Sequence, residues 1–191
     1  MYVFDFDKTL TNQDTLFGFY EFVAGEKRYF RFKKLLLILA AVFYKCKILN
    51  NDQLKSLGIL FFLKGYGRKN LVLAAEGYAN TVKLNQLYHE VYSKIPRDQK
   101  IVISASPTIY LERIFPGQRV VGTELSFAGD VIKGLKVNMF GKAKSNFLKS
   151  TGVGEFDVLY TDSFADKPLM SMARRTFLVR NGEILKDLEA K

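Results

Sequence analysis

The spacing of hydrophobic residues changes twice along the chain. Residues 1–6 form a short apolar run interrupted by Asp5, which is the length of a buried strand rather than of a helix. Through residues 12–96, apolar residues recur at helical spacing between polar capping residues and glycine or proline stops. From about residue 97, apolar runs of strand length alternate with helical stretches. This alternation is typical of a parallel sheet covered by helices.

The pattern predicts the position of each element. Strands are expected at residues 1–6, 100–106, 119–123 and 156–160, with hairpins at 124–139 and 176–185. Helices are expected at residues 16–23, 35–44, 53–63, 70–82, 84–94, 107–114 and 141–149. The fold class is therefore α/β. We expect a Rossmann-like doubly wound parallel sheet from residues 1–11 and 97–191, with an all-helical domain of residues 12–96 inserted after the first strand.

The composition agrees with a globular protein. The 191 residues are 48% hydrophobic and 25% charged, which suits one α/β domain with an insertion and argues against disorder. The one cysteine, Cys46, excludes an internal disulfide and fits a reducing compartment. The first residues are strand-like and lack the basic leader of a signal peptide. We therefore expect a cytoplasmic protein.

Basic residues gather around the apolar run at residues 35–44. The net charge is +10, and residues 27–47 hold seven basic residues and no acidic one. This charge favours anionic partners such as phosphorylated metabolites, nucleic acid or anionic lipid. Ten apolar residues are about half of what a transmembrane helix needs. The segment is either a buried helix with a solvated basic end, or a helix that binds a hydrophobic ligand or lies on the inner face of the membrane.

Polar side chains follow three of the predicted strands. Asp5 and Asp7 follow the first, Ser104 ends a second, and Asp162 and Asp166 follow a third. Taken alone, Asp5 and Asp7 suit either a helix-capping turn or a Mg²⁺ site with acid–base chemistry. Since neighbouring parallel strands meet at one crevice, we expect the three groups to converge there. A lysine, Lys144, opens the helix that precedes the third strand, and together these groups suit phosphoryl transfer.

This ordered set resembles the motifs of the haloacid dehalogenase superfamily. The resemblance is to its phosphoserine-phosphatase-like branch (subfamily IB), which carries a helical cap of the C1 type after the first motif. The four matching motifs are Asp5-Phe6-Asp7-Lys8-Thr9-Leu10-Thr11, Ile103-Ser104-Ala105-Ser106-Pro107, Gly141-Lys142-Ala143-Lys144 and Thr161-Asp162-Ser163-Phe164-Ala165-Asp166. Four motifs in the right order form a specific signal, and they cover nearly the whole predicted core.

Two residues depart from the motifs, and a third competes for a role. Lys8 stands where the family usually has glycine after the second aspartate, and Thr161 where it usually has glycine before Asp162. Lys142 competes with Lys144 for the cationic role, and the Gly-x-x-Lys spacing favours Lys144.

The resemblance implies a Mg²⁺-dependent phosphatase that works through an aspartyl-phosphate. Asp5 would be the nucleophile, and Asp7 the general acid and base. Mg²⁺ would be held by Asp5, Asp162 and the main-chain carbonyl of Asp7. Ser104, Lys144 and Thr9 would bind the phosphate, with Asp166, Ser106 and Ser163 in support. Because a halide leaving group needs no general acid, Asp7 argues against a dehalogenase.

The predicted cap suggests a substrate class. Its basic and apolar texture resembles that of the bacterial phosphatidylglycerophosphatase of this superfamily, which implies a lipid phosphate substrate. Soluble phosphomonoesters such as phosphoserine or a sugar phosphate are the alternative. A non-enzymatic membrane-surface protein or nucleic-acid-binding protein ranks lower. The aspartates are intact, no nucleic-acid recognition module is present, and we expect no nucleic acid partner.

Overall fold

The apolar runs pair into one central sheet. The computed structural model describes residues 1–25 and 29–189. Its strands are β1 (Tyr2–Phe4), β2 (Lys100–Pro107), β3 (Val120–Ala128), β4 (Val131–Val137), β5 (Phe156–Thr161), β6 (Ala173–Arg180) and β7 (Glu183–Glu189). Their order in the sheet is β4-β3-β2-β1-β5-β6-β7. The five inner strands run parallel, and the edge strands β4 and β7 are antiparallel to their neighbours. The doubly wound α/β sheet is confirmed.

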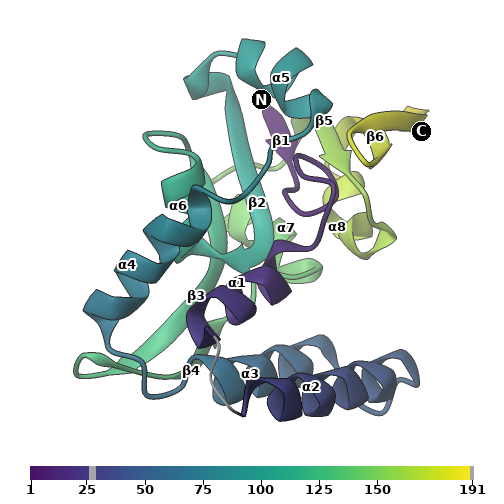
Figure 1. The fold of residues 1–191 in the computed structure, drawn as a ribbon. Coiled ribbons are helices and arrows are strands. Elements are labelled where there is room, and N and C mark those ends of the chain that lie inside the picture. Colours follow the sequence, from purple (N-terminus) through teal and green to yellow (C-terminus); the bar gives the residue numbers. More distant parts are fainter. Residues whose placement is uncertain (26–28, 190–191) are drawn as a thin grey trace.

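The helices fall into two groups along the chain (Figure 1). Between β1 and β2 lie α1 (Thr15–Ala24), α2 (Phe30–Lys45), α3 (Asn51–Phe62), α4 (Arg68–Ala79), α5 (Gln86–Glu90) and two 3-10 turns, Tyr92–Lys94 and Arg97–Gln99. Among the later strands lie α6 (Thr108–Ile114), α7 (Lys142–Ser150), the 3-10 turn Phe164–Asp166 and α8 (Lys167–Met170). The boundary of a separate domain at residues 12–96 stays a prediction.

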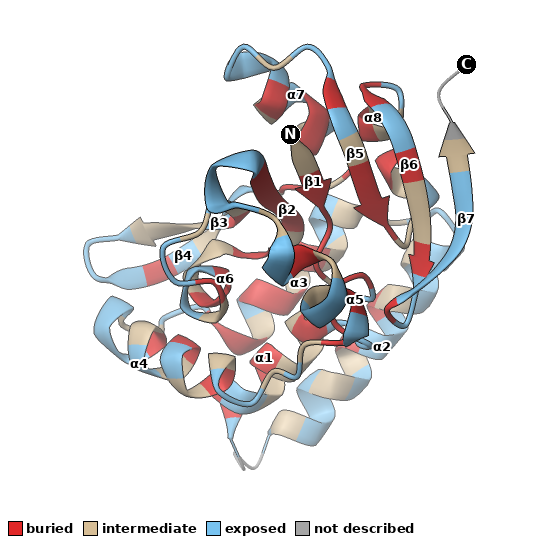
Figure 2. Cartoon of the chain, turned by 90° about the horizontal axis from the view of Figure 1, so that it is seen from above, coloured by how far each residue is buried: buried red, intermediate tan, exposed pale blue. Residues whose placement is uncertain are grey.

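The strands bury alternate side chains against different helices. Val3 belongs to a hydrophobic cluster with Leu148 of α7 and Leu169 of α8. Its neighbour Phe4 belongs to a second cluster, with Tyr110 of α6. Since successive strand residues point to opposite faces, the two clusters cover the two faces of the sheet. Figure 2 shows β1, β2 and β5 as the most buried strands of the sheet.

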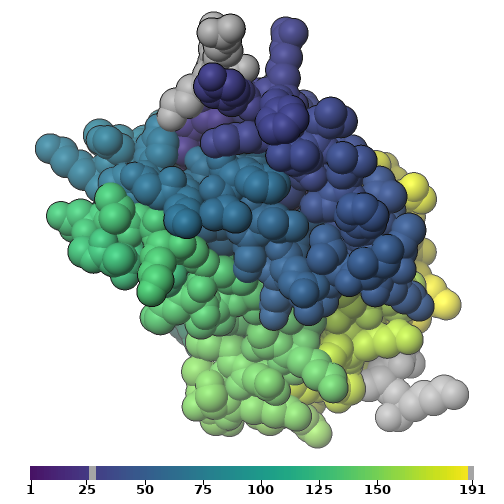
Figure 3. All heavy atoms as spheres, turned by 90° about the horizontal axis from the view of Figure 1, so that it is seen from below, coloured from purple at the N-terminus to yellow at the C-terminus, as the bar shows by residue number. Residues whose placement is uncertain are grey.

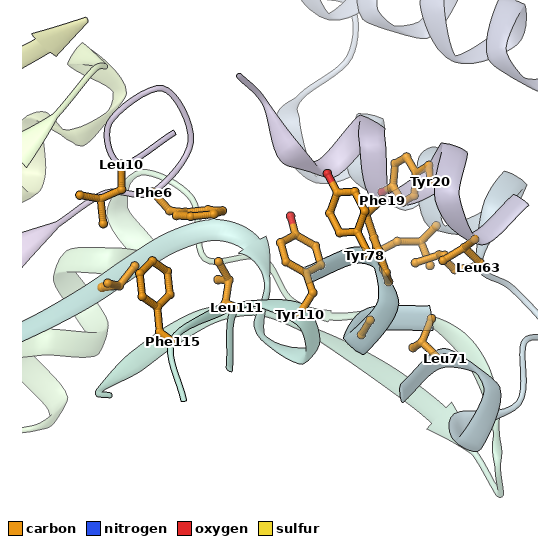
Figure 4. Packing of buried hydrophobic residues seen from close by; sticks show 14 of the residues in the cluster. Phe6, Leu10, Phe19, Tyr20, Leu63, Leu71, Tyr78, Tyr110, Leu111 and Phe115 are labelled. Carbon is orange, nitrogen blue, oxygen red and sulfur yellow. The ribbon is translucent and has the colours of Figure 1, made fainter. Parts of the chain in front are cut away.

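The second cluster extends from α6 into the first group of helices (Figure 4). The rings of Phe19 in α1 and Tyr110 in α6 have centroids 4.9 Å apart. Tyr78 in α4 lies 5.4 Å from each of them. Aromatic pairs at this spacing add to the stabilisation from burial alone. Helices α1 and α4 are thereby fixed against the sheet through α6.

Helices α2 and α3 lie side by side beyond α1 (Figure 1). A capping box begins α3: the Asn50 side chain accepts from the Gln53 N–H at 2.9 Å, and the Gln53 side chain accepts from the Asn50 N–H at 2.8 Å.

No helix in the described ranges is long and apolar enough to cross a membrane. Lys27 and Arg28 of the basic segment, and the last two residues of the predicted core, lie outside the described residues.

Two expected elements differ in the structure. The helix expected at residues 84–94 ends at Glu90, and a 3-10 turn follows. Ser93 Oγ donates to the His89 carbonyl at 2.8 Å, taking the acceptor that a continuing helix would use. The strand expected at residues 119–123 and the first arm of the next hairpin form one continuous strand, β3. The hairpin turn at Asn181-Gly182 is confirmed, with positive φ at both residues.

Candidate active site

The carboxyl end of β1 places Asp5 at the centre of the sheet. The strand lies between β2 and β5, where the strand order changes side: β2, β3 and β4 extend the sheet on one side, and β5, β6 and β7 on the other. Ligands of doubly wound sheets bind at such a switch point. Asp5 follows the strand directly, and its N–H donates to the Tyr160 carbonyl at 2.9 Å. The Phe6 N–H donates to Asp5 Oδ1 at 2.7 Å, which fixes the carboxylate.

Lys144 connects Asp5 to Asp166. Its Nζ lies 3.0 Å from Asp5 Oδ2 and 2.9 Å from Asp166 Oδ2. Thr161 Oγ1 donates to the same Asp166 oxygen at 2.9 Å. Lys144 is only 2% exposed at the start of α7, whereas Lys142 is exposed. The structure therefore brings Lys144 to the aspartates, as the spacing predicts.

The charges around Lys144 do not balance. Burial raises the pKa of Asp5 to about 8; Lys144 lowers this pKa, whereas the charges of Asp166 and Asp162 raise it. Burial also raises the pKa of Asp162, although Lys8 and Lys144 oppose this. Burial by itself would lower the pKa of Lys144, but Asp5 and Asp166 outweigh it and raise the pKa. Lys144 thus pairs with Asp5 and Asp166 and acts on Asp162 through its charge, and a further cation at this end of the pocket would lower the pKa of Asp5 and favour its charged form.

Asp7 is held by hydroxyl groups from two other elements. Its Oδ1 accepts from the N–H of Thr15 at 2.7 Å and from the Thr15 hydroxyl at 2.6 Å. Its Oδ2 accepts from the Ser106 hydroxyl at 2.6 Å. The Tyr110 hydroxyl lies 2.9 Å from that of Thr15 and extends the network. Burial and the charge of Asp14 raise the pKa of Asp7, whereas the bonds from Ser106 and Thr15 lower it.

Lys8 shows why a glycine is usual at its position. Its φ is 57°, in the left-handed region that costs most side chains about 1–2 kcal/mol. The strained backbone turns the chain between Asp7 and Thr9. The Lys8 side chain is exposed and its charge acts on Asp162, so the departure adds a cation beside the predicted metal ligand.

Most of the predicted site residues line one pocket of about 400 Å³. The polar floor is made by strand ends and the start of α7: Asp5, Asp7, Ser106, Lys144, Asp162, Ser163 and Asp166. Its other wall is largely apolar and comes mainly from the helices: Leu16, Phe17, Tyr20, Leu37, Ile38, Ala41, Leu54 and Phe140.

Ser104 and Thr9 are buried and do not line the pocket, and the Ser104 hydroxyl accepts from the Ser106 N–H at 3.0 Å. Phosphate binding by these two residues stays a prediction.

The floor of the pocket has donors of the kind that Mg²⁺ prefers. Within residues 1–25 and 29–189, no three histidine, cysteine or acidic side chains form a ready-made metal cage. The predicted set asks for less, because it uses two carboxylates and one main-chain carbonyl. Asp5, Asp7 and Asp162 all line the pocket, and carboxylate and carbonyl oxygens are the ligands that a hard divalent cation takes. The residues present therefore fit the metal.

The structure adds site residues that the motifs do not contain. Thr15 begins α1 and reaches Asp7, and Tyr110 comes from α6. Lys55, on α3, lines the pocket with a side chain that is nearly buried. Its Nζ donates to Ala105 O at 2.6 Å, to Thr123 Oγ1 at 3.1 Å and to Asn138 Oδ1 at 2.5 Å. A lysine on the otherwise apolar face of the helix at residues 53–63 was the signal that could have indicated it.

The chain matches one family of known proteins. The sequence model of haloacid dehalogenase-like hydrolases matches residues 2–171. No curated protein sequence matches the chain. A Bordetella pertussis Tohama I protein of unknown function shares 18% identity, with a TM-score of 0.70 over 93% of this chain and 88% of its own.

Two further solved structures share the fold. A phosphoserine phosphohydrolase-like protein from Francisella tularensis is 14% identical, with a TM-score of 0.65 over 93% of this chain and 85% of its own. A phosphoserine phosphatase from T. onnurineus is 15% identical, with a TM-score of 0.60 over 92% and 81%. At these identities the similarity establishes the architecture.

Proposed function

The chain belongs to the haloacid dehalogenase-like hydrolases, and from this premise we propose that it hydrolyses phosphomonoesters with Asp5 as the nucleophile. One observation carries the proposal: Lys144 joins Asp5 to Asp166 on the floor of a pocket that Asp7 and Asp162 also line. A nucleophile, a second carboxylate and a buried cation at one crevice are the parts that phosphoryl transfer needs.

In the first step, Asp5 attacks phosphorus and the bond to the leaving oxygen breaks, which gives an aspartyl-phosphate. Lys144 neutralises charge on the phosphoryl oxygens while it keeps Asp5 in position. Asp7 gives a proton to the leaving alkoxide, and its orientation is fixed by Thr15 and Ser106. Bound Mg²⁺, held by Asp5, Asp162 and the Asp7 carbonyl, would supply electrostatic stabilisation of the anionic phosphoryl group.

In the second step, water attacks the aspartyl-phosphate, Asp7 accepts the proton of that water, and inorganic phosphate leaves with Asp5 restored. Asp166 contributes by positioning Lys144, since its Oδ2 binds both Lys144 and Thr161. Ser163 caps the turn that holds Asp166, accepting from the Ala165 N–H at 3.1 Å.

The pocket wall indicates an amphiphilic substrate. A soluble phosphoserine or sugar phosphate presents amino, carboxyl or hydroxyl groups, which need polar partners in the enzyme. The wall from α1, α2 and α3 is mainly apolar, and the three N–H bonds of its nearly buried lysine, Lys55, are already used by Ala105, Thr123 and Asn138. We therefore place a lipid phosphate, such as phosphatidylglycerophosphate, ahead of soluble metabolites. Helices α1, α2 and α3 would act as the cap that selects it.

Hydrolysis of p-nitrophenyl phosphate tests the chemistry. Wild type should turn over with Mg²⁺ and stop when EDTA is added, and restored Mg²⁺ should restore activity. Asp5→Asn should lose about 10³-fold or more in kcat, because the nucleophile is gone. Asp130→Asn, the same change in the exposed β3–β4 turn, is the matched control and should keep full activity. Equal rates in wild type and Asp5→Asn would sink the nucleophile assignment.

A substrate panel tests the specificity. Phosphatidylglycerophosphate in mixed micelles is compared with phosphoserine and glucose 6-phosphate at equal enzyme concentration. We expect the lipid to have the highest kcat/KM, because its chains remove the apolar wall from water. A preference for either soluble compound would keep the phosphatase and reject the lipid substrate.

A further inference from the structure

Helix α2 leaves one apolar side exposed. Its outer face is defined by Phe32, Leu35, Leu39, Val42 and Phe43, whose side chains are between 48% and 61% exposed. Their spacing along the helix places them in one stripe. The opposite side is packed, with Leu37 and Ala40 buried. A continuous exposed apolar stripe of this kind marks an interaction surface.

Aromatic, aliphatic and basic side chains border this stripe. Tyr29 and Ile48, just beyond the two ends of α2, are each 68% exposed. Residues 29–51 contain five basic residues and no acidic one: Arg31, Lys33, Lys34, Lys45 and Lys47. Lys34 pairs with Glu21 and the Lys33 ammonium donates to the Phe61 carbonyl. In the described part of the chain, Arg31, Lys45 and Lys47 form no ion pair.

The stripe adjoins the pocket. Leu37, Ile38 and Ala41 of the same helix line the pocket, so α2 forms a wall with the pocket on one side and the outer face on the other. Ile38 is also 49% exposed and continues the apolar surface from the stripe to the pocket wall. In Figure 3 the dark blue residues of α2 form part of the molecular surface.

We propose that the outer face of α2 docks on an anionic lipid bilayer. The apolar stripe would enter the boundary of the acyl chains while Arg31, Lys45 and Lys47 meet lipid phosphates. Charge complementarity favours this occupant over a second copy of the chain, because a two-fold contact would set the same basic residues against each other. The proposal rests on the proposed function only in that the docked bilayer supplies the substrate.

Vesicle binding tests the surface without any substrate. Wild type is sedimented with vesicles of phosphatidylcholine alone or with one quarter phosphatidylglycerol, at 0.1 M and 0.5 M salt. We expect binding to the anionic vesicles, weaker binding to the neutral ones, and loss of binding at high salt. Leu35→Glu/Leu39→Glu should lose about tenfold or more in vesicle affinity, because two inserted side chains become anions. Its hydrolysis of p-nitrophenyl phosphate should stay within about twofold, since neither residue lines the pocket.

The matched control has the same two changes elsewhere. Leu73→Glu/Leu185→Glu alters exposed leucines of α4 and β7 and should bind vesicles like wild type. Wild type that stays in the supernatant with anionic vesicles, or a Leu35→Glu/Leu39→Glu variant that binds as wild type does, overturns the proposal. The proposal is also overturned if wild type forms a dimer without lipid and the Leu35→Glu/Leu39→Glu variant is monomeric, because the face would then bind a second copy of the chain. Inactive enzyme that still binds vesicles would reject the phosphatase and keep the docking surface.

Discussion

Replacing Lys55 by methionine should change how stability depends on pH. Burial lowers the pKa of the Lys55 ammonium from its ordinary 10.5 to about 8, while the charges of Asp7, Asp14 and Asp52 raise it and that of Lys144 lowers it. No carboxylate of the described residues lies within ion-pair distance of it. Methionine keeps most of the length of the side chain but removes the charge and the three hydrogen bonds, so the titration of the ammonium group is read from the pH dependence of the difference between the two proteins.

The magnitude follows from the two pKa values. At about 1.36 kcal/mol per pKa unit, the difference between 10.5 and about 8 is worth about 3 kcal/mol. Below pH 8, Lys55 carries its proton in both the folded and the unfolded states, and the cost is fully present. As pH rises from 8 to 10.5, the folded state gives up the proton while the unfolded state keeps it. The free energy of unfolding of wild type should therefore rise relative to Lys55→Met across this window.

Urea unfolding, followed by far-ultraviolet circular dichroism at pH 7.5, 9 and 10, measures the gap between the two proteins. The gap should grow in favour of wild type by about 2–3 kcal/mol over this range. Lys69→Met, at an exposed lysine of α4, controls for the loss of one lysine. A gap that stays constant or shrinks would refute the reasoning. It would mean that the oxygens of Ala105, Thr123 and Asn138 solvate the ammonium as well as water does.

Two further substitutions test the site and the sheet that carries it. Lys144→Met in the presence of EDTA should lower the free energy of unfolding by about 3–5 kcal/mol, because Asp5 and Asp166 lose their buried cation. Lys142→Met, two residues away and exposed, should change the free energy of unfolding little, and equal losses in the two variants would contradict the ion-pair assignment. Gly122→Ala should lower the free energy of unfolding by about 2–4 kcal/mol, measured by thermal melting, because a Cβ there would lie 2.9 Å from the Thr108 backbone nitrogen and closer still to the Ser106 carbonyl. An unchanged melting temperature would show that β2 and β3 can separate to make room for the methyl group.

The polar floor of the pocket was predictable because it depends on strands. Asp5 and Asp162 follow neighbouring parallel strands, and ligands of such sheets bind at the carboxyl ends of the strands where the strand order reverses. Lys144 follows from its spacing after Gly141, which the structure places beside both aspartates. The hydrophobic pattern therefore predicted where the strands end, and the motifs predicted which side chains lie at those ends.

Contacts made by the helices were not predictable in the same way. Periodicity shows that a helix has an apolar face, but it does not fix how far the helix is rotated against the sheet. Thr15 reads as an ordinary helix start, and only the packing of α1 brings its hydroxyl to Asp7. Lys55 stands out on an otherwise apolar helix face, but the sequence does not show that three oxygens from distant segments bind it. The continuity of β3 was also missed, because the alternating apolar and polar residues from 124 onward were assigned to a separate hairpin.

The floor and the opposite wall of the pocket come from different elements, and they would serve different purposes: the floor the reaction, the wall the choice of substrate. The floor is built by strand ends that the sheet holds rigidly, and it contains the groups that a phosphoryl transfer needs whatever the leaving group is. The opposite wall comes mainly from helices α1, α2 and α3, with no acidic side chain other than Asp14 among the described lining residues of these helices and their flanks. A wall that is mainly apolar can shield a hydrocarbon chain from water at about 25 cal/mol per Å². Because α2 also exposes its other side, the same helix would link the choice of substrate to the surface from which that substrate comes.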